Sequence, residues 1–388
     1  MFRAVLFSFV FPKVITLYAA EILLLGNIIR KITYSLFSLG ERVQLVVFRS
    51  QFEKTFASIV VFEFFFKVSV LLFSSMASGE LEALKIAYQI KMLLYFYFFL
   101  FLPYNYIGAL IKRYIGTITA LHFIISLVIL SYALTQHPFQ SLLWRSKEFG
   151  MRFVGFTGSS IGFDGIVLTG STANAVGILY LILFIYFQNN KSHYFLKSIC
   201  ILGLFLSFSQ TAFLGFFGYM IVLFFNNIHR LRYWIVFIST FLALLYVSDI
   251  MGYSVLDRVL YTIENIGSTR RSPSLGDRYV QLSNFTYVLA ECPGVLFLGE
   301  YYLAISQCPK TYILESYFLE QMQSFGFIGF TLALIKFLAF IYILKQRSAQ
   351  KFNYFYIFWF FSNFIAANTF ETDFILLTLI AITVYQRK

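Results

Sequence analysis

Long apolar runs recur along nearly the whole chain, and polar or charged residues mark the ends of each run. A helix of about 20 apolar residues crosses the hydrocarbon core of a bilayer, which is about 30 Å thick. The pattern therefore predicts an all-α fold, a polytopic transmembrane helical bundle of about 11–12 helices that forms one integral membrane domain over residues 1–388. The expected crossings lie at about 5–27, 55–78, 86–111, 114–134, 174–190, 196–208, 210–226, 233–250, 322–344, 352–369 and 373–386.

The loops between these runs fall into two groups, those rich in Lys and Arg and those that are not. Because loops rich in Lys and Arg stay in the cytoplasm, the positions of these residues predict the orientation of the chain from residue 28 onward. Two long segments, about 135–173 and about 251–321, then lie on the opposite face, and the mixture of Gly, Pro, charged and aromatic residues in the second predicts a folded cap on the membrane surface. The basic, amphipathic stretch 28–54 leaves two topologies open, because it either lies on the cytoplasmic surface or contributes one more crossing.

Composition supports a membrane protein and argues against a soluble one. Hydrophobic residues make up 59% of the chain and charged residues 12%, which is about half the charged share of an average soluble domain. The formal net charge is +12, but basic cytoplasmic loops account for it, so we expect no nucleic-acid partner. The N-terminal apolar stretch leads to no small-residue cleavage site, and we expect it to remain as an anchor.

The two outer segments contain arginines that orientation does not require. A guanidinium group is always charged and binds phosphate through a bidentate fork, so such a set is typical of an anion-binding site. The alternative for each arginine is a pairing with a lipid headgroup or a nearby acid. The candidates are Arg152, Arg258, Arg270, Arg271 and Arg278.

Acidic residues and one histidine supply candidate bases. Glu315 stands closest to the membrane helix that follows the second outer segment, where partial desolvation raises the pKa of a carboxyl and suits it to general-base chemistry. The alternative is a solvated surface acid. Glu300 lies earlier in the same segment, and His137 is the one histidine in an outer loop. The chain has no Asp-x-Asp motif, so we expect no metal and no cofactor.

Ionisable residues inside the predicted crossings form a separate group. We expect Lys67, Lys91 and Lys336 to reach the membrane surface or to pair internally. His122 is expected to hydrogen-bond between helices.

The cysteines leave two alternatives open. Cys292 and Cys308 each precede a proline in the second outer segment, and disulfides persist in an oxidising compartment. The pair is therefore either a disulfide or two buried thiols. Cys200 lies in a predicted membrane helix, away from both.

Four stretches resemble, in order, motifs of the O-antigen polymerase and O-antigen ligase superfamily, which are membrane glycosyltransferases of the C class. The stretches are residues 152–158 with Asn174, residues 207–215, residues 276–279 followed by Pro293, Gly294 and Gly299, and residues 315–319 followed by Gly326 and Gly329. Two positions depart from the pattern: Gln210 stands where many members have Arg, and Glu315 stands where ligases usually have His. The acid favours a polymerase over a ligase.

The resemblance implies a metal-independent surface-polysaccharide polymerase on the outer, periplasmic face of a bacterial inner membrane. Its substrates would be glycan repeat units carried by undecaprenyl pyrophosphate, and a chain-length regulator would be a partner besides the lipid bilayer. Arg152, Arg278, Arg270 and Arg271 would bind the pyrophosphate, Glu315 would deprotonate the acceptor hydroxyl, and Gln210, Glu300 and His137 would be accessory. The alternatives are an O-antigen ligase acting on lipid A core and a flippase for lipid-linked oligosaccharides. A flippase usually has an internal repeat, which this sequence does not show.

Overall fold

The structure is a computed structural model of the chain, and part of the chain is described here. The described residues are 13–14, 26, 30, 33, 51–79, 83–101, 113–124, 126–127, 161–163, 166–169, 173–189, 194–207, 210–227, 229, 231, 234–235, 238–239, 242, 246, 283–306, 316–347 and 353–365.

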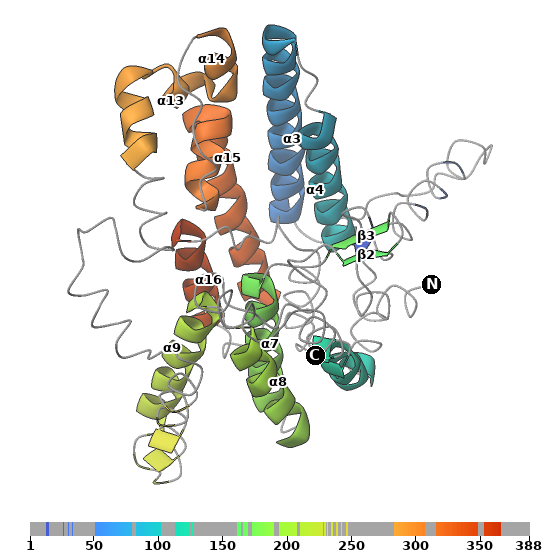
Figure 1. Ribbon diagram of the computed structural model, residues 1–388, viewed down its shortest axis with the longest axis vertical. Helices are drawn as coiled ribbons and strands as arrows, with labels where there is room; N and C mark the ends of the chain where they lie inside the picture. The colour runs from blue at the N-terminus through green and yellow to red at the C-terminus, as the bar shows by residue number, and fades with distance from the viewer. Residues whose placement is uncertain are drawn as a thin grey trace.

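The described part of the chain is almost entirely helical (Figure 1), which confirms the all-α class. Its helices are α3 (Gln51–Ser78), α4 (Ala83–Phe101), α7 (Ala173–Asn189), α8 (Tyr194–Leu206), α9 (Gln210–Asn226), α13 (Val295–Leu298), α14 (Glu300–Ile305), α15 (Tyr317–Arg347) and α16 (Asn353–Ile365). Several of these helices lie within a few residues of the predicted crossings. Residues 283–291 are also helical, and residues 283–306 together are called the cap below.

A small antiparallel sheet in the order β1-β3-β2 is the exception to the helical pattern. Its strands are β1 (Lys13–Val14), β2 (Ile161–Phe163) and β3 (Ile166–Thr169). The prediction of a helical crossing over 5–27 is therefore wrong at Lys13 and Val14. Pro12 directly precedes this strand, and proline disfavours a helix interior while β-branched residues such as Val14 favour strands.

Two apolar stretches of the described chain are long enough to cross a membrane, Gln51–Ser78 and Tyr317–Ile343. Shorter apolar helices are Val176–Gln188, Tyr194–Leu206 and Ala212–Asn226. Helices α3 and α15 pack against each other in antiparallel directions. The ring of Phe52 at the start of α3 lies 4.7 Å from that of Tyr342 near the end of α15. At the opposite end of α3, the ring of Phe73 lies 6.2 Å from that of Tyr301 in the cap.

Helix α15 is a hairpin rather than one straight crossing. Gly326 has φ 67° and ψ −167°, which interrupts the helix. The ring of Phe318 lies 5.7 Å from that of Phe337, although a continuous helix would separate the two residues by about 28 Å along its axis. The chain thus reverses at Gly326 into a short arm, residues 316–325, in which the Ser316 carbonyl accepts the first helical hydrogen bond, and a long arm, residues 327–347. The single crossing predicted at 322–344 is replaced by the long arm, which at about 31 Å is long enough to cross a bilayer by itself.

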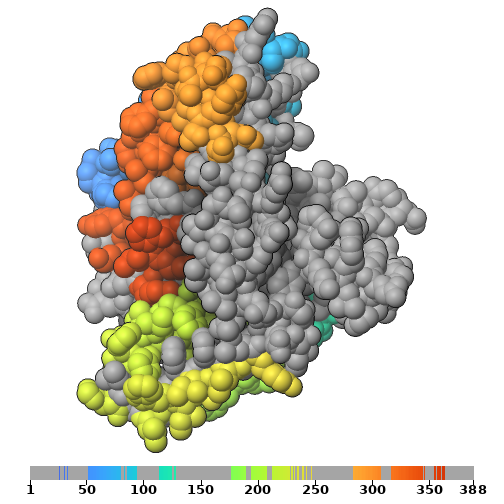
Figure 2. Space-filling model, turned by 60° about the vertical axis from the view of Figure 1, so that its left-hand side comes forward, coloured from blue at the N-terminus to red at the C-terminus, as the bar shows by residue number. Residues whose placement is uncertain are grey.

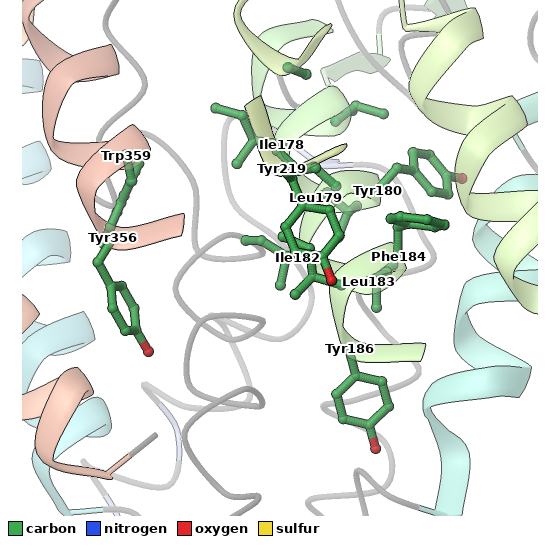
Figure 3. Packing of buried hydrophobic residues seen from close by; sticks show 14 of the residues in the cluster. Ile178, Leu179, Tyr180, Ile182, Leu183, Phe184, Tyr186, Tyr219, Tyr356 and Trp359 are labelled. Carbon is green, nitrogen blue, oxygen red and sulfur yellow. The ribbon is translucent and has the colours of Figure 1, made fainter. Parts of the chain in front are cut away.

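An aromatic core joins α7, α8, α9, α15 and α16 (Figure 3). The ring of Phe184 in α7 lies 5.4 Å from that of Phe216 in α9. Trp359 of α16 is fully buried, and its ring lies 4.9 Å from that of Phe337. Glycines let the helices approach, because a Cβ at Gly203 of α8 would lie 2.6 Å from the ring of Tyr180. Close packing of aromatic rings against small residues is typical of helices in membranes.

The cap sits at one end of the bundle, where α3 ends and the two arms of α15 meet (Figure 1). Figure 2 shows the cap, α15 and α16 following one another along one face of the molecule. This arrangement places residues from the second predicted outer segment against the hairpin turn at Gly326.

Candidate functional site

Three charged side chains meet inside the interface between α3 and α15. The Nζ atom of Lys67 lies 2.7 Å from Oε1 of Glu63, one helical turn away. The Nζ atom of Lys336, in the long arm, donates a hydrogen bond of 2.9 Å to the same oxygen. All three side chains are at most 4% exposed. This group, called the charged cluster below, confirms that Lys67 and Lys336 pair internally.

The helical repeat of α3 explains how the charges come to be buried. The inward stripe of this helix follows a spacing of three and four residues. Its members are Glu53, Phe56, Val60, Glu63, Lys67, Leu71, Ser74 and Ser75. Glu63 lies near the middle of the helix, about 18 Å from Gln51 and about 22 Å from Ser78 along the axis. The opposite face is apolar and open, with Phe62 60% and Phe65 62% exposed.

The charged cluster also touches the short arm of the hairpin. The Nζ atom of Lys67 lies 5.1 Å from the centre of the Phe325 ring, within the range of a cation–π interaction. Lys67 therefore links α3 to the short arm directly, and through Glu63 to the long arm.

The short arm carries buried polar atoms without partners. Among the described residues, Oγ of Ser316, Oε1 of Gln321 and Oε1 of Gln323 are buried and make no hydrogen bond. Ser316 is 8% exposed and Gln321 is 7% exposed. Buried polar atoms in proteins are nearly always hydrogen-bonded, so a concentration of unbonded atoms on one arm requires an explanation.

Two glycines lock the cap onto the hairpin turn. Gly299 has φ 56° and Gly326 has φ 67°, a region that favours glycine. A Cβ at Gly299 would lie 2.4 Å from the carbonyl oxygen of Ser324, and a Cβ at Gly326 would lie 2.4 Å from that of Phe297. The two turns interlock through their backbones, so neither position has room for a side chain.

Glu300 holds the same junction together through its carboxylate. Its Oε1 accepts a 3.1 Å hydrogen bond from Oγ of Ser324, and both of its oxygens accept hydrogen bonds of 2.8–2.9 Å from Nζ of Lys85 at the start of α4. The Glu300 side chain is 18% exposed and that of Lys85 is 50% exposed. Glu300 was predicted as an accessory catalytic residue, and these bonds give it a part in joining the cap, α4 and α15.

A disulfide also ties down the cap. Cys292 is disulfide-bonded, whereas Cys200 is free and buried. Cys308, its predicted partner, lies outside the described residues. The disulfide alternative is confirmed for Cys292.

A third polar contact lies away from this interface. Nδ1 of His122 and the hydroxyl oxygen of Tyr180 are 2.8 Å apart and both are buried. This contact confirms the expected hydrogen bond of His122 between helices, and it joins residues 113–124 to α7.

Most of the residues predicted for the site lie outside the described part of the chain. These are Arg152, His137, Arg270, Arg271, Arg278 and Glu315. Gln210 is the first residue of α9. Ser316, which directly follows Glu315, is buried at the start of the short arm. The structure therefore brings Glu300 to the hairpin and leaves the arginine set as a prediction.

Sequence reasoning missed Glu63, the carboxylate at the centre of the charged cluster. The signal was present in the spacing, because Glu63 and Lys67 stand one turn apart within an otherwise apolar run. In the described part of the chain, no group of three or more His, Cys, Asp or Glu side chains is arranged to hold a metal ion.

Comparison with known proteins finds no matching protein family, no matching curated protein and no matching solved structure. The resemblance carried by the four motifs therefore stays a prediction.

Proposed function

We propose that this chain is a polytopic protein of a bacterial inner membrane that polymerises surface polysaccharide. It would join glycan repeat units carried by undecaprenyl pyrophosphate at the periplasmic face. The proposal combines the motif resemblance with two features of the described structure.

The distribution of polarity in α3 and α15 supports insertion in a membrane. The charged cluster is buried between the two helices, while large apolar side chains point outward, including Phe65 at 62% and Phe327 at 58% exposure. Charged residues within membranes face the bundle interior and pair with one another, and apolar residues face the lipid. A soluble helix pair would have the opposite distribution.

The observation that carries the enzymatic proposal is the junction of two motifs. Gly299 comes from the third motif of the resemblance and Gly326 from the fourth, and the two interlock at the hairpin turn. Glu300 of the cap is held at the same junction by its hydrogen bond with Ser324. The two glycines are 27 residues apart in the sequence, and residues of different motifs that come together in space are candidates for a shared site. The disulfide of Cys292 supports the placement of this junction on the oxidising side.

In the proposed reaction, an acceptor hydroxyl oxygen attacks the anomeric carbon of the donor glycan. The bond from that carbon to the pyrophosphate oxygen breaks, and undecaprenyl pyrophosphate leaves with the bonding electrons. Glu315 takes the hydroxyl proton, and Arg152 and Arg278, with Arg270 or Arg271, stabilise the leaving anion. Positioning the two lipid-linked substrates supplies the rest of the rate acceleration.

A deletion strain tests this proposal. We expect its surface polysaccharide to carry at most one repeat unit, and complementation with Glu315→Gln to leave that defect in place, because the amide cannot take the proton. Electrophoresis of the extracted polysaccharide gives the chain-length distribution. An unchanged ladder of long chains would exclude a polymerase, and loss of the single capped unit would indicate a ligase or a flippase instead.

A further inference from the structure

The helix that begins at Arg113 buries polar side chains and exposes apolar ones. Thr119, His122 and Ser126 are buried on one face, where His122 contacts Tyr180 of α7. The residues of the opposite face are exposed, and at about 100° per residue they fall within an arc of about 120°. This face, called the exposed stripe below, consists of Arg113, Thr117, Leu121, Ile124 and Leu127. Polar groups inside and apolar groups outside are the distribution expected of a helix in contact with lipid.

The exposed stripe is cationic at one end and apolar at the other. Arg113 stands at its start, and Ile124, which is 54% exposed, lies about 17 Å further along the helix axis. One leaflet of a bilayer with its headgroups is about 20 Å thick, half of the whole. The stripe therefore has the length and the order of polarity of one phospholipid molecule, with the charge at the level of the headgroup.

Helix α8 runs beside this helix in the same direction. A Cβ at Gly116 would lie 3.1 Å from Cδ1 of Leu196, so the starts of the two helices are in contact. About 10 Å further along each, the side chain of Tyr180 meets His122 on one helix and Gly203 on the other. The two helix starts therefore lie at one level of the membrane.

Each helix start carries a cation beside a tyrosine ring. Cζ of Arg113 lies 5.5 Å from the centre of the Tyr114 ring, and Nζ of Lys197 lies 5.3 Å from that of Tyr194. In the described part of the chain, neither cation is paired with a carboxylate. Tyrosine side chains gather where a membrane meets water, and Tyr194 is 86% exposed. The two cations therefore stand at headgroup level, where an anion from outside the protein can reach them.

The arrangement of charge indicates which lipid fits. A phosphodiester offers acceptor oxygens to a guanidinium fork and to an ammonium group. In a zwitterionic lipid, the headgroup's own amine balances that phosphate, whereas an anionic lipid keeps its full negative charge. Each Lys or Arg near an anionic membrane surface strengthens attachment about fivefold, so two cations at one position select the anionic headgroup.

We propose that the adjoining starts of α8 and the helix at Arg113 bind an anionic phospholipid of the cytoplasmic leaflet. Arg113 and Lys197 hold its phosphate. The apolar part of the exposed stripe, with Leu202 of α8 at 52% exposure, lies along its acyl chains. The Lys and Arg residues of the loops predict that this end of the two helices is cytoplasmic. Such a lipid site is independent of polymerase activity and requires only that the chain is inserted in a membrane.

The test measures lipid binding to the full-length chain purified in detergent. The probes are phosphatidylglycerol, which is anionic, and phosphatidylcholine, which is zwitterionic, with identical acyl chains, and native mass spectrometry counts the bound molecules. The test variant combines Arg113→Gln with Lys197→Gln. A second variant, Arg113→Lys with Lys197→Arg, keeps both charges. Lys54→Gln is the matched control, because Lys54 is an exposed cation near the start of α3 on the same predicted side.

We expect the wild type to bind phosphatidylglycerol at least about tenfold more tightly than phosphatidylcholine. The double glutamine variant should bind the two lipids about equally, whereas the charge-keeping variant and Lys54→Gln should retain the preference. Glycerophosphoglycerol, the same headgroup without acyl chains, should not compete for the site. The unfolding temperature of each variant without lipid shows whether it is folded. If the double glutamine variant is not, Arg113→Gln alone should lower the preference about fivefold.

Equal binding of both lipids by the wild type would overturn the site, and so would a preference that survives without the two charges or is lost when both are kept. A loss in Lys54→Gln as large as in the double glutamine variant would show general attraction to a basic surface instead. Displacement by glycerophosphoglycerol would show a phosphate site that does not need a lipid. The polysaccharide ladder of the deletion strain is judged separately, because an unchanged ladder would exclude the polymerase and leave the lipid site in place.

Discussion

The aromatic core around Trp359 and the charged cluster around Glu63 are buried to a similar degree, yet different forces hold them together. In the aromatic core, Phe184, Phe216 and Tyr219 pack edge to face with ring centres 5.4–6.2 Å apart. Each contact there is weak, and the packing tolerates exchange of one apolar side chain for another. In the charged cluster, two ammonium groups contact the same carboxylate oxygen.

The charged cluster depends on a specific arrangement of atoms, whereas the aromatic core depends on the total volume of packed apolar side chains. Removing one member of a buried ion pair leaves the others uncompensated, whereas removing all of them is often neutral. The charged cluster lies between α3 and α15, and the glycine interlock and Glu300 join the cap to the turn of α15, where two motifs of the resemblance meet. Helices α7, α8 and α9 pack together with α15 and α16 in the aromatic core.

The largest effect is expected from Glu63→Leu. This change removes the carboxylate that Lys67 and Lys336 both contact, and breaking a buried ion pair costs about 3–5 kcal/mol of unfolding free energy. That is a large share of the stability of an ordinary protein. We expect little folded protein, measured as the monodisperse fraction in size-exclusion chromatography after detergent extraction.

The triple variant Glu63→Leu, Lys67→Met, Lys336→Met is the control, and it should restore most of the folded fraction. If Glu63→Leu alone folds as well as the wild type, the charged cluster does not stabilise the fold. Equal damage in the single and triple variants would indicate that packing at these positions, and not charge, is decisive.

The next effect is expected from Gly326→Ala at the interlock. The backbone conformation alone costs about 1–3 kcal/mol for a residue with a side chain, and the new Cβ would collide with the carbonyl of Phe297. Gly79→Ala is the matched control, because Gly79 also has positive φ, at 71°, but has nothing within 4 Å of a Cβ. The unfolding temperature should fall further below that of the wild type in Gly326→Ala than in Gly79→Ala. Equal losses in the two variants would mean that the cap and the hairpin turn are not in close contact.

A smaller effect is expected in the aromatic core, from Phe216→Leu. Phe216→Leu removes about three carbons from a buried ring that is 1% exposed, which we expect to cost about 1–2 kcal/mol of unfolding free energy. Phe225→Leu, on the same helix but 66% exposed, is the control and should unfold at the wild-type temperature. A loss at Phe216 as large as that at Glu63 would contradict the contrast between the two regions.

The sequence allows the helices to be predicted far better than their contacts. Apolar runs predicted α9 with its observed bounds, Gln210–Asn226, because length and hydropathy are local properties. The hairpin at Gly326 was missed, since Phe325-Gly326-Phe327 continues the apolar run and no local signal distinguishes a reversal from a helix. Glu63 was missed although its spacing to Lys67 is a local signal, whereas its contact with Lys336 joins residues that are distant in sequence and could not be predicted. The predicted arginines and Glu315 fall outside the described residues, so only Glu300 and Gln210 have an observed place.

The smallest effect is expected from Lys85→Gln, and it completes the comparison of buried and exposed charge. The Lys85 side chain is 50% exposed in its pair with Glu300, and such pairs contribute about 1 kcal/mol or less. Salt sharpens the contrast, because the screening length is only about 3 Å at 1 M ionic strength. We expect a small loss of unfolding temperature in Lys85→Gln at low salt and none at 1 M NaCl. The deficit of Glu63→Leu should persist at both, since salt does not reach a side chain that is 4% exposed. If the unfolding temperature of Lys85→Gln is lowered equally at low and high salt, the ion pair of Lys85 and Glu300 behaves like the charged cluster, as a pair shielded from solvent.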